Sequence, residues 1–450
     1  MGCDAPVPVL LPHDKLVVAV RSGPAGWTPG PDGQPHGFEH DLIVAYAAQR
    51  KLPLIVKPVE SAAALTAALA GGEAHVGVGG LYRSPTAAPP AASDGMPLAL
   101  AWTSGFHEVE PVIISASDGF RPKGWSDLRG AVVGYIAATG LDAEVAQLAA
   151  RHPDIRFMAL DLPSADALIA RVSEGRVDYA VVSSLQAALA QNVHLNFDIA
   201  LKVGGKLELA WLVPERDEDL RTKLDAFIAT ARRSGLVDKL SQRYFAHARE
   251  VRRIDAAVFQ ERLRSVLPDY RKLFLDAQEA TGIEWRLLAA VAYQESQWEP
   301  LATSETGVRG FMQLTEDTAR HLGVSDRMDP RSSILAAARY LRDLKSRLPG
   351  RIAEPDRTWL ALAAFNIGLG HLEDARVLAQ RQKLDPDAWQ DVKQALPLLA
   401  LPEHYEKAKL GYARGGMPVA FVDRVRGYYD ILLRHEAPHA PRLRMSENAS

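Results

Sequence analysis

The chain has 450 residues, of which 47% are hydrophobic, so it is long and apolar enough to form two or three domains with packed cores. Its formal net charge of -3 gives no broadly basic surface, and we expect neither a nucleic-acid partner nor a polybasic contact with a membrane. No apolar run approaches the roughly 18 residues that a membrane-spanning helix needs, so the sequence predicts no such helix.

Cys3 is the single cysteine of the chain. One cysteine can form neither an intramolecular disulfide nor a cysteine-based metal site, and we predict no metal and no cofactor. Gly2 and Cys3 follow Met1 directly, which is what remains when a lipoprotein leader is replaced by a start methionine. Cys3 is therefore either a lipid attachment site or a free thiol in a frayed terminus.

The first half of the chain alternates β-rich runs with helical segments. The apolar run at residues 16–20 predicts a buried strand, and a loop rich in glycine and proline follows at 23–35. A helix is expected from residue 37 toward residue 50, and a second strand at 54–56. Strand, helix and strand in this order predict a parallel pair joined by a crossover helix.

Residues 64–78 and 167–182 are similar to each other, because in both a helical pattern ends at a glycine and turns into an apolar strand. Two such copies predict two similar α/β lobes. We expect the first lobe at 13–108 and 202–248, and the second lobe at 109–201.

Three features within residues 13–248 resemble the periplasmic solute-binding proteins of the polar amino-acid type. They are G-F-E-H-D-L at 37–42, the paired helix-glycine-strand units, and S-G-L-V-D-K-L-S-Q-R-Y-F at 234–245. The resemblance implies a two-lobed module with a small ligand, such as a muropeptide, bound between the lobes. Helix N-termini that face a cleft of this kind suit an anion.

The resemblance implies ligand contacts at Arg83, Thr139 and Ser183, but the chain departs from it at two positions. Ala87 stands where these proteins usually have the arginine that holds the carboxylate of the ligand, and Ser183 stands where they usually have an aspartate for its amino group. Arg83 is the candidate replacement for the missing cation. A free amino acid would leave charges unpaired, so we expect a larger or less charged ligand, or a module that only positions the next domain.

The second half of the chain is expected to be helical. Residues 249–266 are rich in arginine and contain no glycine or proline, which predicts a helical connector. Residues 267–435 show amphipathic helical patterns throughout, and residues 436–450 form a polar tail. The predicted fold is a two-lobed α/β module followed by an all-α domain.

Glu295 lies among apolar residues that recur at three- and four-residue steps, as on one face of a helix: Leu287, Leu288, Val291 and Trp298. A carboxyl on such a face is partly buried, and burial raises its pKa and keeps it protonated near neutrality. It can then act as a general acid. Considered alone, this glutamate is more simply explained by an ion pair with an arginine such as Arg286 or Arg309.

Three sequence blocks favour the catalytic explanation. Q-E-S-Q-W at 294–298, G-V-R-G-F-M-Q-L-T at 307–315 and A-A-F-N-I-G-L-G at 363–370 occur in this order, and together they resemble the catalytic domain of the soluble-lytic-transglycosylase family. The resemblance implies a lysozyme-like helical domain that cleaves the β-1,4 bond between N-acetylmuramic acid and N-acetylglucosamine in peptidoglycan.

In this family, as the resemblance implies, Glu295 protonates the glycosidic oxygen and then takes the proton of the muramoyl 6-hydroxyl as a 1,6-anhydro ring closes. No water enters, so no second carboxylate is needed to activate one. The resemblance also implies residues that contact the glycan: Ser296, Met312, Gln313, Phe365 and Asn366.

Phe365 and Phe421 stand where the family usually has tyrosines, so two hydroxyls that help to position the acid or an intermediate are absent. Tyr412, Tyr428 and Tyr429 are candidate replacements. Two alternatives therefore stay open, a peptidoglycan-binding sensor that no longer turns over and a hydrolase of the same helical fold.

The resemblance implies a protein of the bacterial periplasm. Lipid on Cys3 would hold it to a membrane, for which we favour the outer membrane. The resemblance also suggests that a ligand in the first module regulates the lyase.

Overall fold

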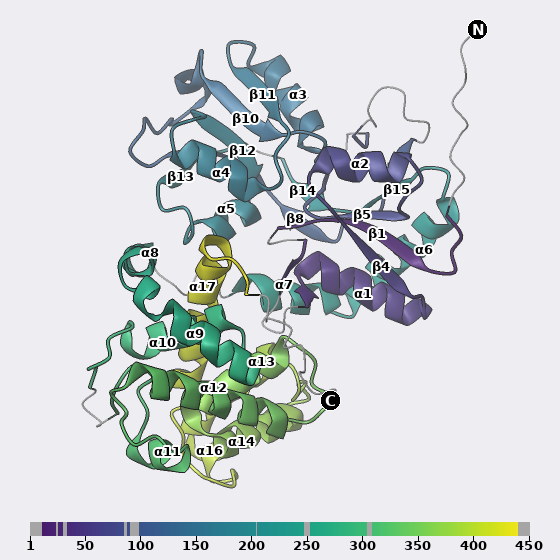
Figure 1. Ribbon diagram of the computed structural model, residues 1–450. Helices are drawn as coiled ribbons and strands as arrows, with labels where there is room; N and C mark the ends of the chain where they lie inside the picture. The colour runs from purple at the N-terminus through teal and green to yellow at the C-terminus, as the bar shows by residue number, and fades with distance from the viewer. Residues whose placement is uncertain are drawn as a thin grey trace, which may run out of the picture. The chain divides into compact units, whose positions relative to one another are not determined.

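The computed structural model describes residues 11–23, 26–29, 34–84, 88–90, 99–203, 205–246, 253–303 and 308–439. One compact unit ends at Ala246, and the chain that follows forms a second unit. In Figure 1 the first unit runs from purple to teal and the second from green to yellow. Cys3 and most of the predicted tail lie outside the described residues. Among the described helices, none combines the length and the apolar character needed to cross a bilayer.

The first lobe is built on a five-stranded sheet with the order β4-β1-β5-β15-β7. The pairings of β1 with β4 and β5 are parallel, whereas β15 is antiparallel to β5 and β7. The strands are β1 (Leu16–Arg21), β4 (Leu54–Val59), β5 (Val76–Val78), β7 (Leu100–Trp102) and β15 (Leu212–Pro214). The helices are α1 (Phe38–Arg50), α2 (Ala62–Ala70), α6 (Glu218–Arg233) and α7 (Leu236–Phe245).

The apolar run of β1 is continuous because helices cover both faces of this sheet. Leu16, Val18 and Val20 pack with α1, α6 and α7, while Val17 and Ala19 pack with α2 on the other face. Figure 1 shows α2 on one side of β1 and β4, and α1 with α7 on the opposite side.

The second lobe repeats this arrangement in a sheet with the order β11-β10-β12-β9-β13. Its first three strands are parallel, and β9 is antiparallel to β12 and β13. The prediction of two similar α/β lobes is therefore confirmed. The elements are β9 (Pro111–Ala116), η1 (Trp125–Leu128), β10 (Val132–Ile136), α3 (Leu141–Arg151), β11 (Arg156–Leu160), α4 (Ala165–Ser173), β12 (Tyr179–Ser183), α5 (Ser184–Ala190) and β13 (Phe197–Lys202).

Short strands complete the first unit. A three-stranded sheet consists of β6 (Tyr82–Arg83), β14 (Leu207–Leu209) and β8 (His107–Val109), and a two-stranded sheet consists of β2 (Thr28–Pro29) and β3 (Pro35–His36).

The described part of the second unit is helical apart from isolated β-bridges that link Arg309 to Thr303 and Leu314. The predicted all-α domain is confirmed. Its helices are α8 (Arg253–Ser265), α9 (Leu267–Thr281), α10 (Trp285–Ser296), α11 (Glu316–His321), α12 (Pro330–Arg347), α13 (Asp356–Ile367), α14 (Leu369–Arg381), α15 (Trp389–Ala395), η3 (Leu396–Ala400), α16 (Pro402–Tyr405) and α17 (Gly416–His435).

The segment predicted as a connector contains α8, and this helix packs into the second unit. The ring of Phe259 is fully buried, with its centroid 4.5 Å from the ring of Tyr293 and 4.8 Å from that of Tyr428. Aromatic pairs at this separation stabilise a core. We conclude that α8 belongs to the core of the helical unit.

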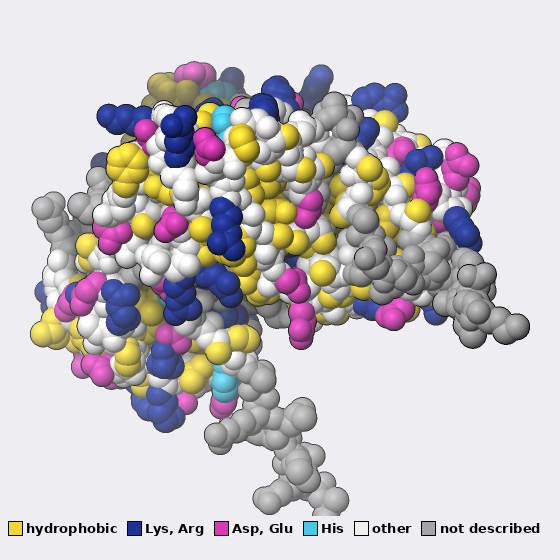
Figure 2. Space-filling model, turned by 90° about the horizontal axis from the view of Figure 1, so that it is seen from above, with side chains coloured by type: hydrophobic (Ala, Val, Ile, Leu, Met, Phe, Trp, Pro, Cys, Tyr) yellow, Lys and Arg dark blue, Asp and Glu magenta, His cyan; other side chains and the backbone are white. Residues whose placement is uncertain are grey.

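On the face of the molecule shown in Figure 2, basic and acidic side chains are interspersed. This distribution agrees with the small net charge of -3 and gives no broad surface of one sign on that face.

Candidate functional site

Glu295 is the penultimate residue of α10, a helix that is apolar on nearly all sides because it lies in the core of the second unit. The helix ends at Ser296, because Gln297 and Trp298 both adopt left-handed backbone conformations, with φ of 54° and 62°. The prediction that the helix continues to Trp298 is therefore wrong. Its indole still lies against α10, since Nε1 donates to the carbonyl of Ala289 at 2.9 Å.

The Glu295 carboxyl is half-buried, and no described residue forms a hydrogen bond or an ion pair with it. Burial raises its pKa to about 8, so the carboxyl is mainly protonated at neutral pH. The simpler explanation, an ion pair with Arg286, does not hold. The guanidinium of Arg286 instead contacts the carboxylate of Glu284 at 2.8 Å.

Ser296 links the end of α10 to the turn that follows the second motif. Its hydroxyl lies 2.8 Å from the carbonyl oxygen of Phe311 and 3.2 Å from that of Ala292, and it donates to these two acceptors. Because its proton is used by the backbone, this hydroxyl positions the turn beside Glu295. Contact of Ser296 with the glycan stays a prediction.

The turn at residues 309–314 is fixed by close backbone packing. Gly310 has φ of 82°, and a Cβ atom there would lie 1.8 Å from the carbonyl oxygen of Arg327, so only glycine fits. The Gln313 amide donates through Nε2 to the carbonyls of Ala302 at 3.0 Å and Gly310 at 2.9 Å. Its Oε1 is left as the acceptor for a sugar hydroxyl.

Met312 was expected to contact the glycan, and the structure corrects this. Its side chain is 1% exposed and lies in the core beside Phe311, which is fully buried against Tyr270. The G-F-M-Q turn therefore points its two large apolar side chains inward. A buried thioether has no surface to offer to a sugar.

Phe365 and Asn366 lie in the last turn of α13, which ends at Ile367. The side chain of Asn366 is exposed and has no partner among the described residues, so its amide can accept and donate hydrogen bonds to a glycan. The half-buried ring of Phe365 stacks on Phe421 at a centroid distance of 6.4 Å, and Tyr340 from α12 lies at 5.7 Å. The two phenylalanines that stand in place of tyrosines therefore lie in one aromatic cluster, which the sequence did not reveal.

The three tyrosines proposed as replacements have other neighbours in the described structure. Tyr412 is 55% exposed and lies beside Tyr405. Tyr428 packs on Phe259 and Tyr293, and burial raises the pKa of the Tyr429 phenol well above its ordinary value. Tyr340 is the hydroxyl-bearing residue that sequence reasoning missed.

Thr139 and Ser183 come together in the first unit, where the two lobes touch. The Tyr82 hydroxyl donates to Ser183 Oγ at 3.1 Å, and the Tyr82 backbone N–H donates to the carbonyl of Thr139 at 2.7 Å. The cavity that Thr139 and Tyr82 line has a volume of only about 10 Å³, which is room for about one water molecule. The two lobes are therefore closed on each other in this structure.

Arg21 and Glu39 are charged residues of this region that sequence reasoning did not assign. Arg21 is 3% exposed; it donates through Nε to the carbonyl of Gly79 at 3.0 Å and through Nη2 to that of Gly80 at 3.2 Å. The fully buried carboxyl of Glu39 accepts the backbone N–H groups of the same two glycines, and burial raises its pKa to about 7. In the sequence, Arg21 could have been recognised as a candidate ligand-binding residue because it is a single charged residue at the end of an apolar strand.

Arg83 does not line the cavity between the lobes. Its guanidinium lies 3.5 Å from the carbonyl of Thr103 and lines a separate hollow of about 530 Å³ on the first lobe, together with Arg221 and Asp225. Arg21 lines the cavity instead, and its Nη1 has no hydrogen-bond partner among the described residues. The cation that lines the cavity between the lobes is therefore Arg21, the last residue of β1.

Among the described residues, no group of three or more histidine, cysteine, aspartate or glutamate side chains is placed to hold a metal ion.

Comparison with known proteins gives a family model, the transglycosylase SLT domain, that matches residues 272–388. A membrane-bound lytic murein transglycosylase F of Methylobacillus flagellatus is 38% identical over 448 residues, covering 98% of this chain and 93% of the relative. The protein of that name from Thiobacillus denitrificans is 38% identical over 441 residues, covering 98% and 92%. Among solved structures, a mutant of ArgBP from T. maritima matches 52% of this chain and 95% of its own, at 21% identity and a TM-score of 0.43.

Proposed function

Because the chain belongs to the family of membrane-bound lytic murein transglycosylase F, we propose that Glu295 is its catalytic acid and, in a second step, its base. The protein is a peptidoglycan lytic transglycosylase, a lyase that degrades murein. The observation that carries the proposal is the half-buried Glu295 carboxyl, which has no partner among the described residues and a pKa of about 8. Such a group holds a proton at neutral pH and can give it to a weakly basic oxygen.

The first step breaks the bond between muramic acid C1 and the glycosidic oxygen. Glu295 donates its proton to that oxygen, and the N-acetylglucosamine side leaves with a new hydroxyl. The Glu295 carboxylate then removes the proton of the muramoyl 6-hydroxyl while the oxygen of this hydroxyl attacks C1. The products are a 1,6-anhydro-muramoyl end and a free N-acetylglucosamine end, and the carboxyl is protonated again without any water being consumed.

The neighbouring residues have separate tasks in this proposal. Asn366 and the Oε1 of Gln313 bind sugar hydroxyls or acetamido groups, and the ring of Phe365 packs on a sugar face. Ser296 holds the turn in place beside the acid through its bond to Phe311. Each of these contacts is a proposal supported by exposure and by the hydrogen bonds that the protein leaves unused.

Digestion of purified murein, followed by mass spectrometry of the soluble products, tests the reaction. We expect 1,6-anhydro-muropeptides. A hydrolase would release reducing ends that are heavier by one water, and a sensor without turnover would bind murein and release nothing. The stacked rings of Phe365 and Phe421, which lack both usual hydroxyls, are the observation that favours this last alternative.

The name of its relatives supports association with a membrane, and we infer that the protein acts on murein in the periplasm. We infer that lipid on Cys3 supplies this association, at the outer membrane. Loss of the protein from membrane fractions after Cys3→Ser supports this inference, and unchanged fractionation contradicts it.

We further infer that a ligand with a carboxylate binds between the two lobes of the first unit and alters turnover. The unpaired Nη1 of Arg21 supports a carboxylate, and the cavity of about 10 Å³ requires the lobes to open for entry. The Tyr82–Ser183 hydrogen bond would break in that opening. A ligand changes turnover only by binding the open and closed states with different affinities.

Addition of murein stem peptides is expected to shift both the melting temperature and the turnover of murein, whereas free amino acids, which would leave a charge unpaired, are expected to have a smaller effect. In Arg21→Met the response is expected to vanish because the cation is gone. If neither quantity changes in the natural sequence, the inferred regulation is wrong.

A further inference from the structure

A pocket of about 620 Å³ lies along α14 in the second unit, outside the residues assigned to the reaction. One wall is the face of α14 from Leu369 to Arg381, and the other is the segment at 404–410. The pocket begins close to the proposed site, because Leu369 follows Asn366 by three residues. A ligand bound beside Asn366 can therefore extend into it.

The two walls are held together by specific contacts. The carboxylate of Asp374 accepts the backbone N–H groups of Lys409 at 3.0 Å and of Leu410 at 2.9 Å. Gly370 lets the side chain of Leu410 lie directly on α14, because a Cβ atom there would be 2.3 Å from Leu410 Cδ1. The pocket is thus a built feature of the fold.

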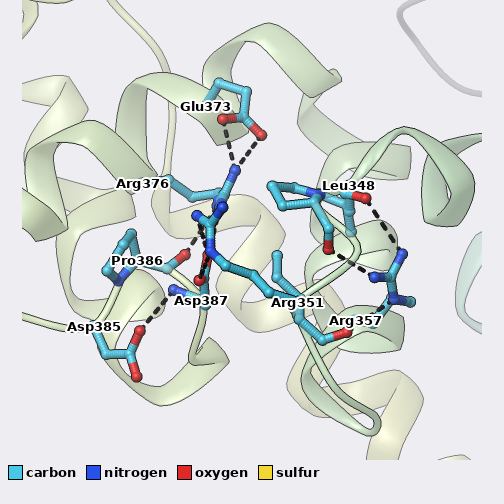
Figure 3. A network of polar contacts seen from close by, with 10 residues as sticks. Leu348, Arg351, Arg357, Glu373, Arg376, Asp385, Pro386 and Asp387 are labelled. Atoms are coloured by element: carbon cyan, nitrogen blue, oxygen red, sulfur yellow. Dashed lines mark hydrogen bonds and ion pairs between the residues drawn. The ribbon is translucent and has the colours of Figure 1, made fainter.

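The acidic side chains of the pocket are largely satisfied from within the protein. Both oxygens of Glu373 accept Nη1 of Arg376 at 2.7 Å, as Figure 3 shows. The same buried guanidinium contacts Asp387 at 2.6 Å and the carbonyl of Pro386 at 2.9 Å. Glu373 therefore contributes little free negative charge, and Asp374 is used to hold the facing segment.

Most basic side chains of the pocket have no such partner; the exception is Arg347, which contacts Asp343 at 3.5 Å. Arg381, Lys407 and Lys409 are exposed, and within the described chain none of them has an acidic partner. Two acids of the lining, Asp374 and Glu406, have no basic partner in the described chain, so three unpaired cations stand against two unpaired carboxylates. Excess positive charge over the apolar surface of Val377 and Leu410, which are 44% and 53% exposed, suits a ligand that carries both carboxylates and small apolar groups.

The length of the pocket indicates the size of the ligand. The 13 residues of α14 span about 20 Å at roughly 1.5 Å per residue. An extended peptide covers at most about 3.3–3.6 Å per residue, so four or five residues reach along most of this helix.

We propose that this pocket binds the short carboxylate-bearing peptide attached to the lactyl group of muramic acid, while the glycan lies along Glu295 and Asn366. The inference rests on the proposed lyase function and names a part of its substrate. Lys407, Lys409 and Arg381 pair with peptide carboxylates, and Val377 and Leu410 contact alanine methyl groups. Peptide-bearing strands are then preferred over bare glycan.

The test compares two substrates, intact murein and the same glycan strands after an amidase has removed their peptides. In the double variant Lys407→Glu, Lys409→Glu, kcat/KM on intact murein is expected to fall about tenfold, since each exposed ion pair contributes up to about fivefold in binding. Activity on the bare glycan is expected to stay unchanged. Lys15→Glu with Lys123→Glu is the control, since it changes the net charge equally at two exposed lysines of the first unit.

Equal losses on both substrates, or no loss on either, would overturn the peptide site. Failure of the lyase function itself looks different, because the natural sequence would then release no 1,6-anhydro product from either substrate. Arg381→Ala gives a second measurement that leaves the 404–410 segment intact, and it should lower kcat/KM on intact murein alone.

Discussion

Glu295→Gln is expected to abolish the release of 1,6-anhydro-muropeptides, with turnover lowered by about 10³-fold or more. Transfer of one proton by a positioned side chain is worth about 10²–10⁴-fold, and this carboxyl acts in both steps. Glutamine preserves the shape of the side chain but cannot give up or accept the proton. Mass spectrometry of digested murein measures the effect.

The same substitution is expected to raise the melting temperature at neutral pH. A carboxyl whose pKa is about 8 in the folded state and about 4.5 when unfolded binds more protons folded, so its contribution to stability falls as the pH rises from 4.5 to 8. The neutral glutamine amide does not lose stability in this way. For Glu295 the loss is up to about 3 kcal/mol at pH 7, since one pKa unit corresponds to about 1.4 kcal/mol. Thermal unfolding of both proteins at pH 5 and pH 7.5 tests the sign.

Glu299→Gln is the matched control, because Glu299 lies four residues further on, is exposed, and pairs with Arg262 at the surface. It should lower turnover by less than about threefold, since exposed ion pairs contribute little. The pH profile adds a second readout: the rate limited by the protonated acid should fall as the pH rises through about 8. Full activity of Glu295→Gln would end the proposal.

Gly310→Ala is expected to destabilise the second unit and to reduce turnover strongly. The new methyl group would lie 1.8 Å from a backbone carbonyl, and the φ of 82° is strained for any residue with a Cβ atom. The turn must therefore move, which breaks the Ser296–Phe311 hydrogen bond next to the acid. We expect a loss of about 2–4 kcal/mol in the free energy of unfolding, within the range of severe single substitutions.

Gly350→Ala serves as the comparison, because a Cβ atom at Gly350 meets nothing within 4 Å and its φ is not in the left-handed range. This variant should unfold within about 0.5 kcal/mol of the natural sequence, as unstrained surface changes do. Denaturant unfolding with turnover measured on the same samples separates the two cases. Equal stability of the two variants would show that the turn accommodates the methyl group.

The sequence predicted Glu295 and the two-lobed module because both depend on local patterns. The apolar periodicity around residue 295 places the carboxyl on the buried side of a helix, and the repeated helix-glycine-strand pattern requires only neighbouring residues. The three motif blocks likewise indicated Asn366 and Gln313 as glycan-binding groups, which stays a prediction. These features need no knowledge of long-range contacts.

The features that the sequence did not predict depend on residues far apart in the chain. Arg21 and Glu39 meet on the backbone of Gly79 and Gly80, and Phe365 meets Phe421 only when α13 and α17 pack. The inward orientation of the Met312 side chain also depends on a turn that packs against the backbone of Arg327. Periodicity can assign a face to a helix, but it cannot say which side chains of a glycine-rich turn enter the core.

The early end of α10 has a further effect on the acid. Peptide dipoles in a helix add up to a partial negative charge at its carboxyl end, and Glu295 lies within the last turn of α10. A negative side chain there is repelled by the backbone itself, so the neutral acid is favoured by a field that no single substitution of a neighbouring side chain removes. The protonated state of the catalytic acid of this lyase is thus favoured in part by the position at which α10 ends.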